Sequence, residues 1–518
     1  MKKTYISTAV VALLAFAACT PKKTQDKVSE NRIMIKTETA RDTISRYIYG
    51  QFAEHLGRCI YDGIWVGENS PIPNTRGIRN DVLAALKEIN VPVLRWPGGC
   101  FADAYFWKDG IGPKDKRKPV LNIYWGNVME DNSFGTHEFL DLCEMLDAEP
   151  YLAVNVGSGT VKDAHDWIEY VTSHGDNPMS RLRKQNGRED PWDVKFWGIG
   201  NENWGCGGNM TDAYYADLFR QFSTYCRADY KVASGGLNHD LNWTETLMKK
   251  TQDYQHLIQG LSYHHYTVCH DWQRKGSAVN FDEKEWFLTV SKNMQMEENL
   301  KDHIAIMEKY DSANKIALIA DEWGNWFDPE PGVDMGILYQ QNTLRDALTA
   351  AIYLNVFNNN CHRVKMANIA QTVNVLQAMV LTKDDMMVKT PTFYVFKMYN
   401  VHYDALLLPT EVTCENYTIE DESIPSLSVS ASRNKAGEIN ITIANVNPGK
   451  EVITSLEIEN LQNPSVKNGT VITAGTMNAF NDFNQAEIVN IKEFKGFKTS
   501  GNNLEVSVPA KSVVRLTL

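Results

Sequence analysis

Two glutamates close apolar segments of the chain, and each has a tryptophan nearby, Trp204 or Trp323. Glu202 ends the run VKFWGIGNE, and Glu322 lies near the end of IALIADEW. Cleaving a glycosidic bond needs one carboxyl group that protonates the departing oxygen and a second near the anomeric carbon. Two carboxyl groups in a partly dry pocket disfavour each other's charge, so one can stay protonated at neutral pH. The pair indicates glycoside hydrolysis; the alternative is two ordinary strand-end glutamates in salt bridges.

Other polar and aromatic side chains fall at the ends of further apolar segments. They are Glu54, Arg95, Cys100, Asn155, Asn201, His264, Tyr266 and Gln371. Carboxylates and amides bind sugar hydroxyls, and aromatic faces cover sugar C–H surfaces, so the set predicts a sugar pocket. Glu54 could instead pair in the core with His55 or Arg58. Arg95 could keep Glu322 ionised, or it could be a purely structural ion-pair partner.

The histidine-rich segment YHHYTVCH does not predict a metal site. Neighbouring residues of a regular strand point to opposite faces, so His264 and His265 cannot both bind one ion. His264 shares a face with Tyr266, which makes it a candidate for the pocket wall or else a core histidine. WGCGGNM lacks the GK[ST] continuation of a phosphate loop. We predict that no metal and no organic cofactor is needed.

From residue 46 to about 385, short apolar segments alternate with amphipathic helical patterns. The predicted strands are 47–52, 91–97, 150–156, 194–202, 231–236, 260–266, 316–323 and 366–373, and the clearest helical patterns are 81–90, 138–147 and 344–357. Apolar strands that alternate with helices predict a parallel sheet closed into a (β/α)₈ TIM barrel, with the active site at the C-terminal strand ends. An open doubly wound sheet would carry a glycine-rich fingerprint after its first strand, and none is present.

From residue 386 to 518, apolar and polar residues alternate, as in half-buried antiparallel strands. Ile439, Ile441 and Ile443 form one such apolar face. This region is predicted to be a C-terminal β-sandwich, and residues 31–45 are predicted to add an N-terminal strand to it. The segment WQRKGSAVNFDEKEWF begins a long excursion between the sixth and seventh barrel strands. We expect it to lie at the rim and shape the leaving-group side.

The first nineteen residues, MKKTYISTAVVALLAFAAC, have the pattern of a signal peptide over residues 1–18. FAAC resembles the bacterial lipoprotein box, so Cys19 is the predicted lipidation site and residues 19–30 a tether. Export to the cell envelope with a lipid anchor is expected, and simple secretion is the alternative. The formal charge of −12 argues against nucleic acid as a partner. The nine cysteines are scattered without a CxxC pair, which indicates buried thiols and neither a zinc ribbon nor a disulfide framework.

Four segments carry a family resemblance. IYGQFAEHLGRCIYDGIW, LRWPGGCFADAYFWKDGIGP, KFWGIGNENWGCGG and LIADEWGNWFD resemble glycoside hydrolase family 51, whose members are chiefly α-L-arabinofuranosidases. The resemblance runs in order from about residue 31 to the C-terminus. It implies that Glu202 is the general acid/base and Glu322 the nucleophile of a two-step displacement with retained configuration. Retaining enzymes hold these carboxyl groups about 5–5.5 Å apart.

The resemblance also implies the sugar-binding residues. Asn201 is expected to bond the sugar 2-hydroxyl, which requires the strand to turn before Glu202. Tyr266 is expected to orient Glu322. The remaining implied binding residues are Glu54, Gln371, Cys100, Trp107 and His264, with Arg95 in support. Many relatives carry asparagine where this chain has Cys100.

The implied activity is exo-acting removal of arabinofuranose from plant polysaccharide side chains such as those of arabinan and arabinoxylan. Family members often form homo-oligomers, so this is a possibility here. One alternative is another retaining glycosidase, a β-xylosidase or an endo-glucanase. The other is a lipid-anchored glycan-binding protein without catalysis, against which the GNE and DEW motifs argue.

Overall fold

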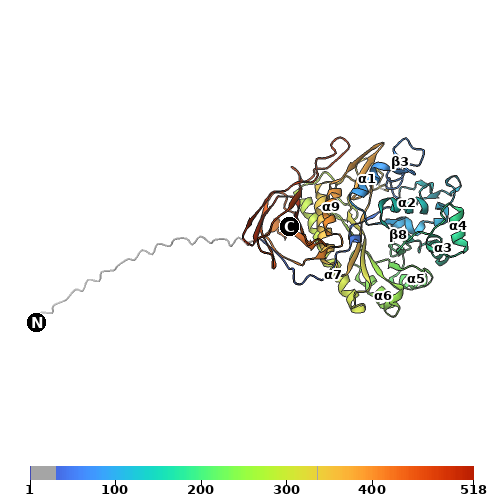
Figure 1. Ribbon diagram of the computed structural model, residues 1–518, viewed down its shortest axis with the longest axis horizontal. Coiled ribbons are helices and arrows are strands. Elements are labelled where there is room, and N and C mark those ends of the chain that lie inside the picture. Colours follow the sequence, from blue (N-terminus) through green and yellow to red (C-terminus); the bar gives the residue numbers. More distant parts are fainter. Residues whose placement is uncertain (2–30, 335) are drawn as a thin grey trace.

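The computed structural model describes residues 31–334 and 336–518, together with Met1. The predicted signal peptide, the tether and Cys19 lie outside the described residues, Met1 apart. Within the described residues, no helix combines the length and apolar character needed to cross a membrane. The chain forms a barrel and a β-sandwich, which lie side by side (Figure 1).

In the described part of the chain, eight parallel strands close a barrel, as predicted. They are β2 (Gly50–Phe52), β5 (Val93–Trp96), β8 (Glu149–Val154), β9 (Phe196–Ile199), β10 (Tyr230–Ala233), β11 (Gly260–Thr267), β12 (Ala317–Asn325) and β13 (Val364–Ala370). Only the end of the first predicted strand is extended, because Arg46–Tyr49 forms a 3₁₀ helix whose N-cap Ser45 accepts a hydrogen bond from the Tyr47 N–H.

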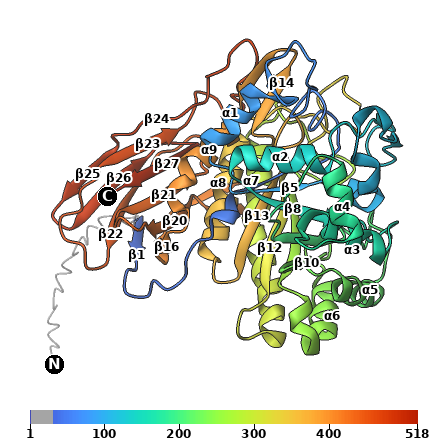
Figure 2. The same ribbon diagram turned by 45° about the vertical axis from the view of Figure 1, so that its right-hand side comes forward.

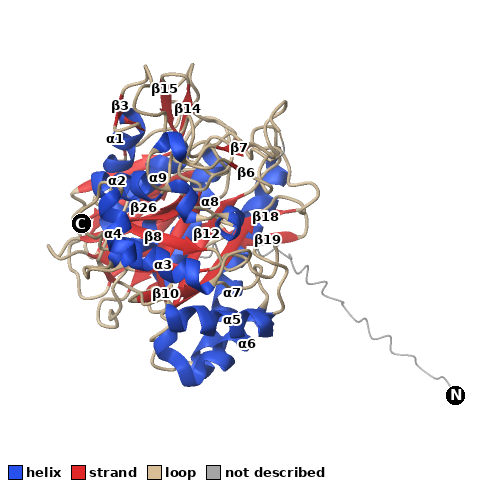
Figure 3. Ribbon diagram, turned by 90° about the vertical axis from the view of Figure 1, so that its right-hand side faces the viewer, coloured by secondary structure: helices blue, strands red, loops and turns tan. Residues whose placement is uncertain are grey.

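Helices surround the barrel, and α3 and α4 lie in front of β8 in Figure 3. They are α1 (Asn80–Glu88), α2 (Thr136–Leu146), α3 (Val161–Thr172), α4 (Pro178–Gln185), α5 (Asp212–Tyr225), α6 (Leu241–Thr251), α7 (Glu283–Tyr310), α8 (Leu344–Asn359) and α9 (Pro391–Tyr399). Their apolar stripes face the strands; in α1, Val82, Leu83 and Leu86 are buried. The helix α9 packs on α8, so the stretch just after residue 385 belongs beside the barrel and not in the sandwich.

Short hairpins lie in strand-to-helix connections of the barrel and, in one case, between two strands of the sandwich. They comprise β3 (Asn74–Thr75) with β4 (Ile78–Arg79), β6 (Val120–Leu121) with β7 (Met129–Glu130), β14 (Val380–Lys383) with β15 (Met386–Lys389), and β18 (Asn416–Ile419) with β19 (Glu422–Pro425). The β6–β7 hairpin brackets Trp125, which reaches the site described below.

The sandwich stacks two sheets (Figure 2). Among the described residues, one sheet has the order β17 (Thr410–Thr413), β1 (Arg32–Ile35), β22 (Val452–Ile458), β26 (Asn503–Val508) and β25 (Phe497–Ser500). The other has the order β16 (Leu406–Leu407), β20 (Leu427–Arg433), β21 (Ile439–Asn445), β27 (Ser512–Thr517), β23 (Asn468–Ile472) and β24 (Lys492–Glu493). The N-terminal strand β1 pairs with β17 and β22, and its Ile33 and Ile35 enter the sandwich core with Ile441 and Ile443.

The polar face of β20 and β21 is also buried, because it packs against α8. The Asn355 side chain donates to the Ser428 hydroxyl at 3.1 Å and accepts from Thr442 at 2.9 Å. Buried polar groups of this kind need partners, and the two domains supply them to each other. The barrel and the sandwich are therefore joined by a specific hydrogen-bonded contact.

Candidate active site

A hollow of about 320 Å³ opens at the C-terminal ends of the barrel strands. The predicted site residues that line it are Glu54, Cys100, Glu202, His264, Tyr266, Glu322 and Gln371. The wall is completed by residues that include Leu56, Trp125, Trp204, Trp272, Trp326, Leu338 and Leu376. Aromatic walls with a few convergent polar groups suit the hydroxyl and C–H faces of a sugar.

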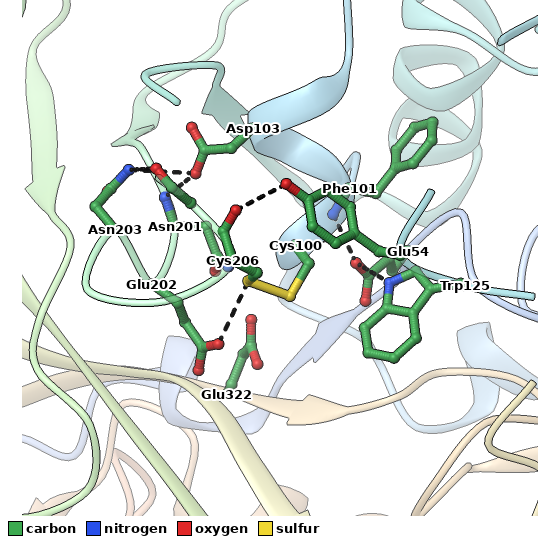
Figure 4. Close-up of a disulfide and its surroundings, with 12 residues drawn as sticks. Glu54, Cys100, Phe101, Asp103, Trp125, Asn201, Glu202, Asn203, Cys206 and Glu322 are labelled. Atoms are coloured by element: carbon green, nitrogen blue, oxygen red, sulfur yellow. Dashed lines mark hydrogen bonds between the residues drawn. A yellow bond between two sulfur atoms is a disulfide. The ribbon is translucent and has the colours of Figure 1, made fainter. Parts of the chain in front are cut away.

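The side chains of the two glutamates, which both line this hollow, lie close together (Figure 4). One oxygen of Glu202, one ring nitrogen of His264 and one oxygen of Glu322 all lie within 4.8 Å of one another. Glu202 comes from the loop after β9, and Glu322 comes from β12. Both carboxyl groups can therefore reach one anomeric carbon.

The backbone turns sharply to present Glu202. The strand β9 ends at Ile199, and both Gly200 (φ 85°) and Glu202 (φ 42°) have left-handed backbone conformations. A non-glycine residue in this region is uncommon and needs its surroundings to hold it. The Glu202 carbonyl accepts hydrogen bonds from the Gly205 and Gly207 N–H groups, at 2.8 and 3.1 Å. This is the turn that the sequence required if Asn201 and Glu202 were both to reach inward.

A β-bulge presents Glu322. The register of β12 against β13 shifts between Ala320 and Trp323, so two consecutive residues face the barrel interior. The Asp321 carboxylate accepts hydrogen bonds from Ser262 and Tyr151 inside the barrel, at 2.5 and 2.7 Å. Glu322 reaches the hollow just above it. A regular strand would have sent one of these carboxylates outward.

Behind the hollow, the Arg95 guanidinium donates hydrogen bonds to two of the predicted site residues. Its Nη1 donates to Glu322 Oε1 at 2.9 Å, and its Nη2 donates to Asn201 Oδ1 at 2.6 Å. Burial opposes the charge of the guanidinium, but Asp321 and Glu322 outweigh that effect and raise the Arg95 pKa. The Tyr266 hydroxyl donates to the other Glu322 oxygen at 2.8 Å. Donors therefore hold both oxygens of Glu322.

His264 lies between the acidic groups. Its Nδ1 is 2.9 Å from Glu202 Oε1 and 3.5 Å from Glu322 Oε2, and its Nε2 is 3.3 Å from Asp321. Burial disfavours the imidazolium, but the carboxylates of Glu322, Asp321 and Glu202 prevail and raise the pKa of His264 to about 10. The neighbouring His265 points away, toward the Tyr353 hydroxyl, as strand alternation requires.

Glu54 accepts three hydrogen bonds at the side of the hollow. The donors are the Phe101 N–H, Trp125 Nε1 and Gln371 Nε2, at 3.1, 2.9 and 3.0 Å. Burial and the nearby charge of Glu322 raise the pKa of Glu54 to about 7, against the lowering effect of these donors. Pairing with His55 or Arg58 is not what holds it.

We expect Glu54→Gln to weaken the pH dependence of stability. The Glu54 pKa is about 7 in the folded protein and 4.5 as the ordinary value, so in this window the folded protein keeps a proton that the unfolded chain releases. Stability is greatest below the lower value and decreases as pH rises through the higher one. Denaturant unfolding from pH 4 to 8 should give a shallower decline for Glu54→Gln than for the unmutated protein. The matched control is Glu298→Gln, an exposed position on α7, and equal slopes for all three proteins would contradict the expectation.

Comparisons with known proteins identify the family of the chain. The family models described as "Alpha-L-arabinofuranosidase 1 domain" and "Alpha-L-arabinofuranosidase C-terminal domain" match residues 85–284 and 321–512. A solved structure, the GH51 arabinofuranosidase from Xanthomonas axonopodis pv. citri, superposes with a TM-score of 0.92 at 43% identity, covering 94% of this chain and 100% of that one. The chain belongs to glycoside hydrolase family 51. It is an α-L-arabinofuranosidase, as the sequence motifs predicted.

Two further relatives extend the comparison. The α-L-arabinofuranosidase from Thermotoga maritima, solved as an arabinose complex, has a TM-score of 0.81 at 30% identity and covers 94% of this chain and 99% of that one. A protein from Bacteroides ovatus is 51% identical over 494 residues, which cover 94% of this chain and 95% of its own. These matches favour an arabinofuranosidase over the β-xylosidase, endo-glucanase and non-catalytic alternatives.

The predicted location of the arabinofuranosidase is wrong. The Bacteroides ovatus relative is named an "Intracellular exo-alpha-L-arabinofuranosidase", which contradicts export and lipid anchoring in the cell envelope. The prediction depended only on the segment before residue 20, and none of that segment beyond Met1 is described by the structure. A short apolar stretch after two lysines is weak evidence for cellular location, since it lies outside the fold that defines the family.

Two tryptophans of the arabinofuranosidase lie in the packing and not in the hollow, and one of them, Trp107, was predicted to bind substrate. The Trp107 indole donates to the Asp163 carbonyl at 2.9 Å and stacks on Trp167, so it belongs to the packing around α3 and not to the hollow. Trp323 stacks on Phe396 outside the barrel, because the bulge ends before it. Both rings are buried in the core.

Cys100 lines the hollow, but it is disulfide-bonded to Cys206 and so is not a free thiol. The expectation of unpaired thiols therefore fails for this pair. Among the described residues, six further cysteines are free, and all but Cys414 are buried. Cysteines far apart in sequence carry no spacing signal, so their pairing follows only from the folded geometry.

Several residues in or behind the hollow of the arabinofuranosidase were not predicted from the sequence. Asp103 and Asp321 hold the strand ends from behind, and Trp125 and Trp326 line the hollow. Asp321 directly precedes Glu322, but the alternation rule hides it unless a bulge is foreseen. Trp272 lies in the excursion that was expected at the rim, and it does line the hollow.

Proposed function

We propose that this arabinofuranosidase cleaves terminal α-L-arabinofuranose from side chains of plant polysaccharides, or from their fragments, by double displacement with retention. Its relatives imply an arabinose-containing glycan as substrate. Exo action is proposed because the Bacteroides ovatus relative is named an exo-enzyme. Formation of homo-oligomers stays a prediction.

The observation that carries the mechanism is the separation of the two carboxyl groups. One oxygen of Glu202 and one of Glu322 lie within 4.8 Å of each other, which fits the gap of about 5–5.5 Å of retaining enzymes better than the wider gap of inverting ones.

In the first step, Glu322 attacks the anomeric carbon while Glu202 gives its proton to the departing oxygen. The glycosidic bond breaks, and an ester joins the sugar to Glu322. In the second step, Glu202 takes a proton from water, the water oxygen bonds to the anomeric carbon, and the ester breaks. Arg95 and Tyr266 support this assignment, because their hydrogen bonds hold the two oxygens of Glu322 in place for attack.

The proposed binding groups surround this reaction centre. Glu54 and Gln371 are proposed to bind sugar hydroxyls, since they lie side by side at 3.0 Å on the wall. Asn201 is proposed to bond the 2-hydroxyl. Within the described chain its Nδ2 is buried without a hydrogen-bond partner, and its Oδ1 is held by Arg95. A buried donor without a partner is costly unless a ligand satisfies it.

Product analysis tests the proposal. Arabinan and arabinoxylan digested side by side should release free arabinose, and proton NMR at early times should show the α-anomer first. Aryl α-L-arabinofuranoside should be hydrolysed far faster than aryl β-D-xyloside. A first-formed β-anomer would refute retention, and a strong preference for the xyloside would refute the sugar assignment.

A further inference from the structure

A short segment after β5 is tied to the Glu202 loop at two points. This segment is the 3₁₀ helix η2 (Cys100–Ala104). Its first residue, Cys100, forms a disulfide with Cys206, four residues after Glu202 (Figure 4). Both cysteines are half-buried, and Cys100 lines the hollow.

The second tie is the carboxylate of Asp103. Its Oδ1 accepts from the Val156 and Gly157 N–H groups at 2.6 and 2.7 Å. Its Oδ2 accepts from the Asn201 N–H at 2.9 Å and from the Asn203 side chain at 3.4 Å. One buried carboxylate thus joins the strand-end connections after β5, β8 and β9, as Figure 4 shows for the Asn201 and Asn203 bonds.

Glu202 lies between the residues that these ties hold. Its neighbours on both sides are bonded to Asp103, and its own backbone has the left-handed conformation that a non-glycine residue keeps only when the surroundings impose it. The Cys206 sulfur lies 3.7 Å from Glu202 Oε2; because a disulfide sulfur has no proton to donate, this is a packing contact. His264 bonds the other oxygen. The carboxyl group is therefore fixed on one side by the disulfide.

We propose that Asp103 and the Cys100–Cys206 disulfide form a brace that positions the carboxyl group of Glu202 for proton transfer, and that reduction of the disulfide weakens catalysis. Asp103 is a positioning residue, since it acts through the backbone on either side of Glu202. The inference rests on the acid/base role proposed for Glu202. Reduction by a dithiol passes two electrons and two protons to the bridge, which gives two cysteine thiols and a cyclic disulfide of the reductant.

The brace predicts a dependence on the leaving group. A displaced acid harms departure of a basic alkoxide, which needs the proton, and spares a 2,4-dinitrophenolate, which departs without it. General acid catalysis is worth about 10²–10⁴-fold, and a misplacement of about 1 Å can cost about 10²-fold. A variant that merely loosens the fold would slow both kinds of substrate equally.

Asp103→Asn is the first test, because asparagine keeps the size of the side chain and loses the acceptors on one side. We expect kcat/KM to fall by about tenfold or more for an alkyl α-L-arabinofuranoside, and by less than about threefold for the 2,4-dinitrophenyl glycoside. The control is Asp166→Asn, another buried aspartate, which contacts Lys108 and Lys162 around α3 and lies away from the hollow. It should not change the ratio of the two rates. An equal loss on both substrates with Asp103→Asn would overturn the brace.

Reduction is the second test, and it needs no variant. Dithiothreitol added to the unmutated enzyme should lower kcat/KM for the alkyl glycoside by about threefold or more, and reoxidation should restore it. The loss is expected to be partial, because Asp103 and the hydrogen bond from Tyr124 to the Cys206 carbonyl remain. The double variant Cys100→Ser, Cys206→Ser should show the lower rate and no response, whereas Cys414→Ser should respond like the unmutated enzyme. Thiol titration shows whether the disulfide has been reduced. If the reduced enzyme keeps full activity, the proposal is overturned.

Glu202→Ala, measured on the same two substrates, distinguishes a failure of the brace from a failure of the acid/base role proposed for Glu202. If it shows the leaving-group dependence and Asp103→Asn and the reduced enzyme do not, the brace is wrong and the acid/base assignment stands. If Glu202→Ala also lacks that dependence, the proposed function itself fails.

Discussion

Glu322→Ala is expected to abolish turnover of every arabinofuranoside, including those with excellent leaving groups. Without the carboxylate no ester to the sugar can form, so the first step is lost whatever the acidity of the departing group. We expect kcat/KM to fall by about 10⁴-fold or more, as for removal of other covalent nucleophiles. Steady-state hydrolysis of 4-nitrophenyl and 2,4-dinitrophenyl α-L-arabinofuranoside measures this directly.

The matched control is Glu298→Ala, which removes an exposed glutamate of α7 and should leave both rates unchanged. Circular dichroism of Glu322→Ala checks that the barrel still folds, because Arg95 loses one of its two acidic neighbours in this variant. Unchanged turnover would show that Glu322 is not the nucleophile. A large residual rate on the activated glycoside alone would mean that the two glutamates have the opposite roles.

Glu202→Ala is expected to show the contrasting pattern. Loss of the proton donor should lower kcat/KM by about 10²–10⁴-fold for substrates with poor leaving groups and much less for the 2,4-dinitrophenyl glycoside. With that substrate the sugar–Glu322 ester forms but hydrolyses slowly, since no base activates water. A fast initial burst of dinitrophenol followed by a slow steady rate is the kinetic signature to look for.

Added azide should partly restore turnover of Glu202→Ala. Azide needs no base to attack the ester, and the space left by the side chain admits it beside the disulfide. The product should be the α-L-arabinofuranosyl azide, because two inversions retain the configuration. The β-azide, or rescue of Glu322→Ala in place of Glu202→Ala, would show that the roles are reversed.

The sequence was most informative where burial leaves a regular trace. Parallel barrel strands are covered on both faces, so they read as apolar runs, and all eight were located. The active-site rule for barrels then placed Glu54, Glu202, Tyr266 and Glu322 on one hollow. Local chemistry also showed the need for a turn at Asn201, since two neighbouring strand residues cannot both face inward.

The same rules failed where irregular backbone decides direction. Alternation along β12 concealed Asp321, because a bulge turns two successive carboxylates inward and leaves Trp323 outside. Alternation in the sandwich also suggested a solvated polar face, but Thr442 and Ser428 are buried against α8. Neither the bulge nor the domain contact has a signature in one strand's own residues, because both depend on a partner element.

What the amino-acid sequence determined by itself is the kind of fold and the family, and it predicted a pair of glutamates that the structure brings together. These follow from short-range order: hydrophobic period, glycine-rich turns and motifs that each lie within one segment. Only the tertiary structure decided that Cys100 meets Cys206, that Asp103 joins three connections and that Trp107 belongs to the packing. Such contacts join residues up to a hundred or so positions apart, and closing a loop of that length is governed by the packing of the whole barrel and not by local preference.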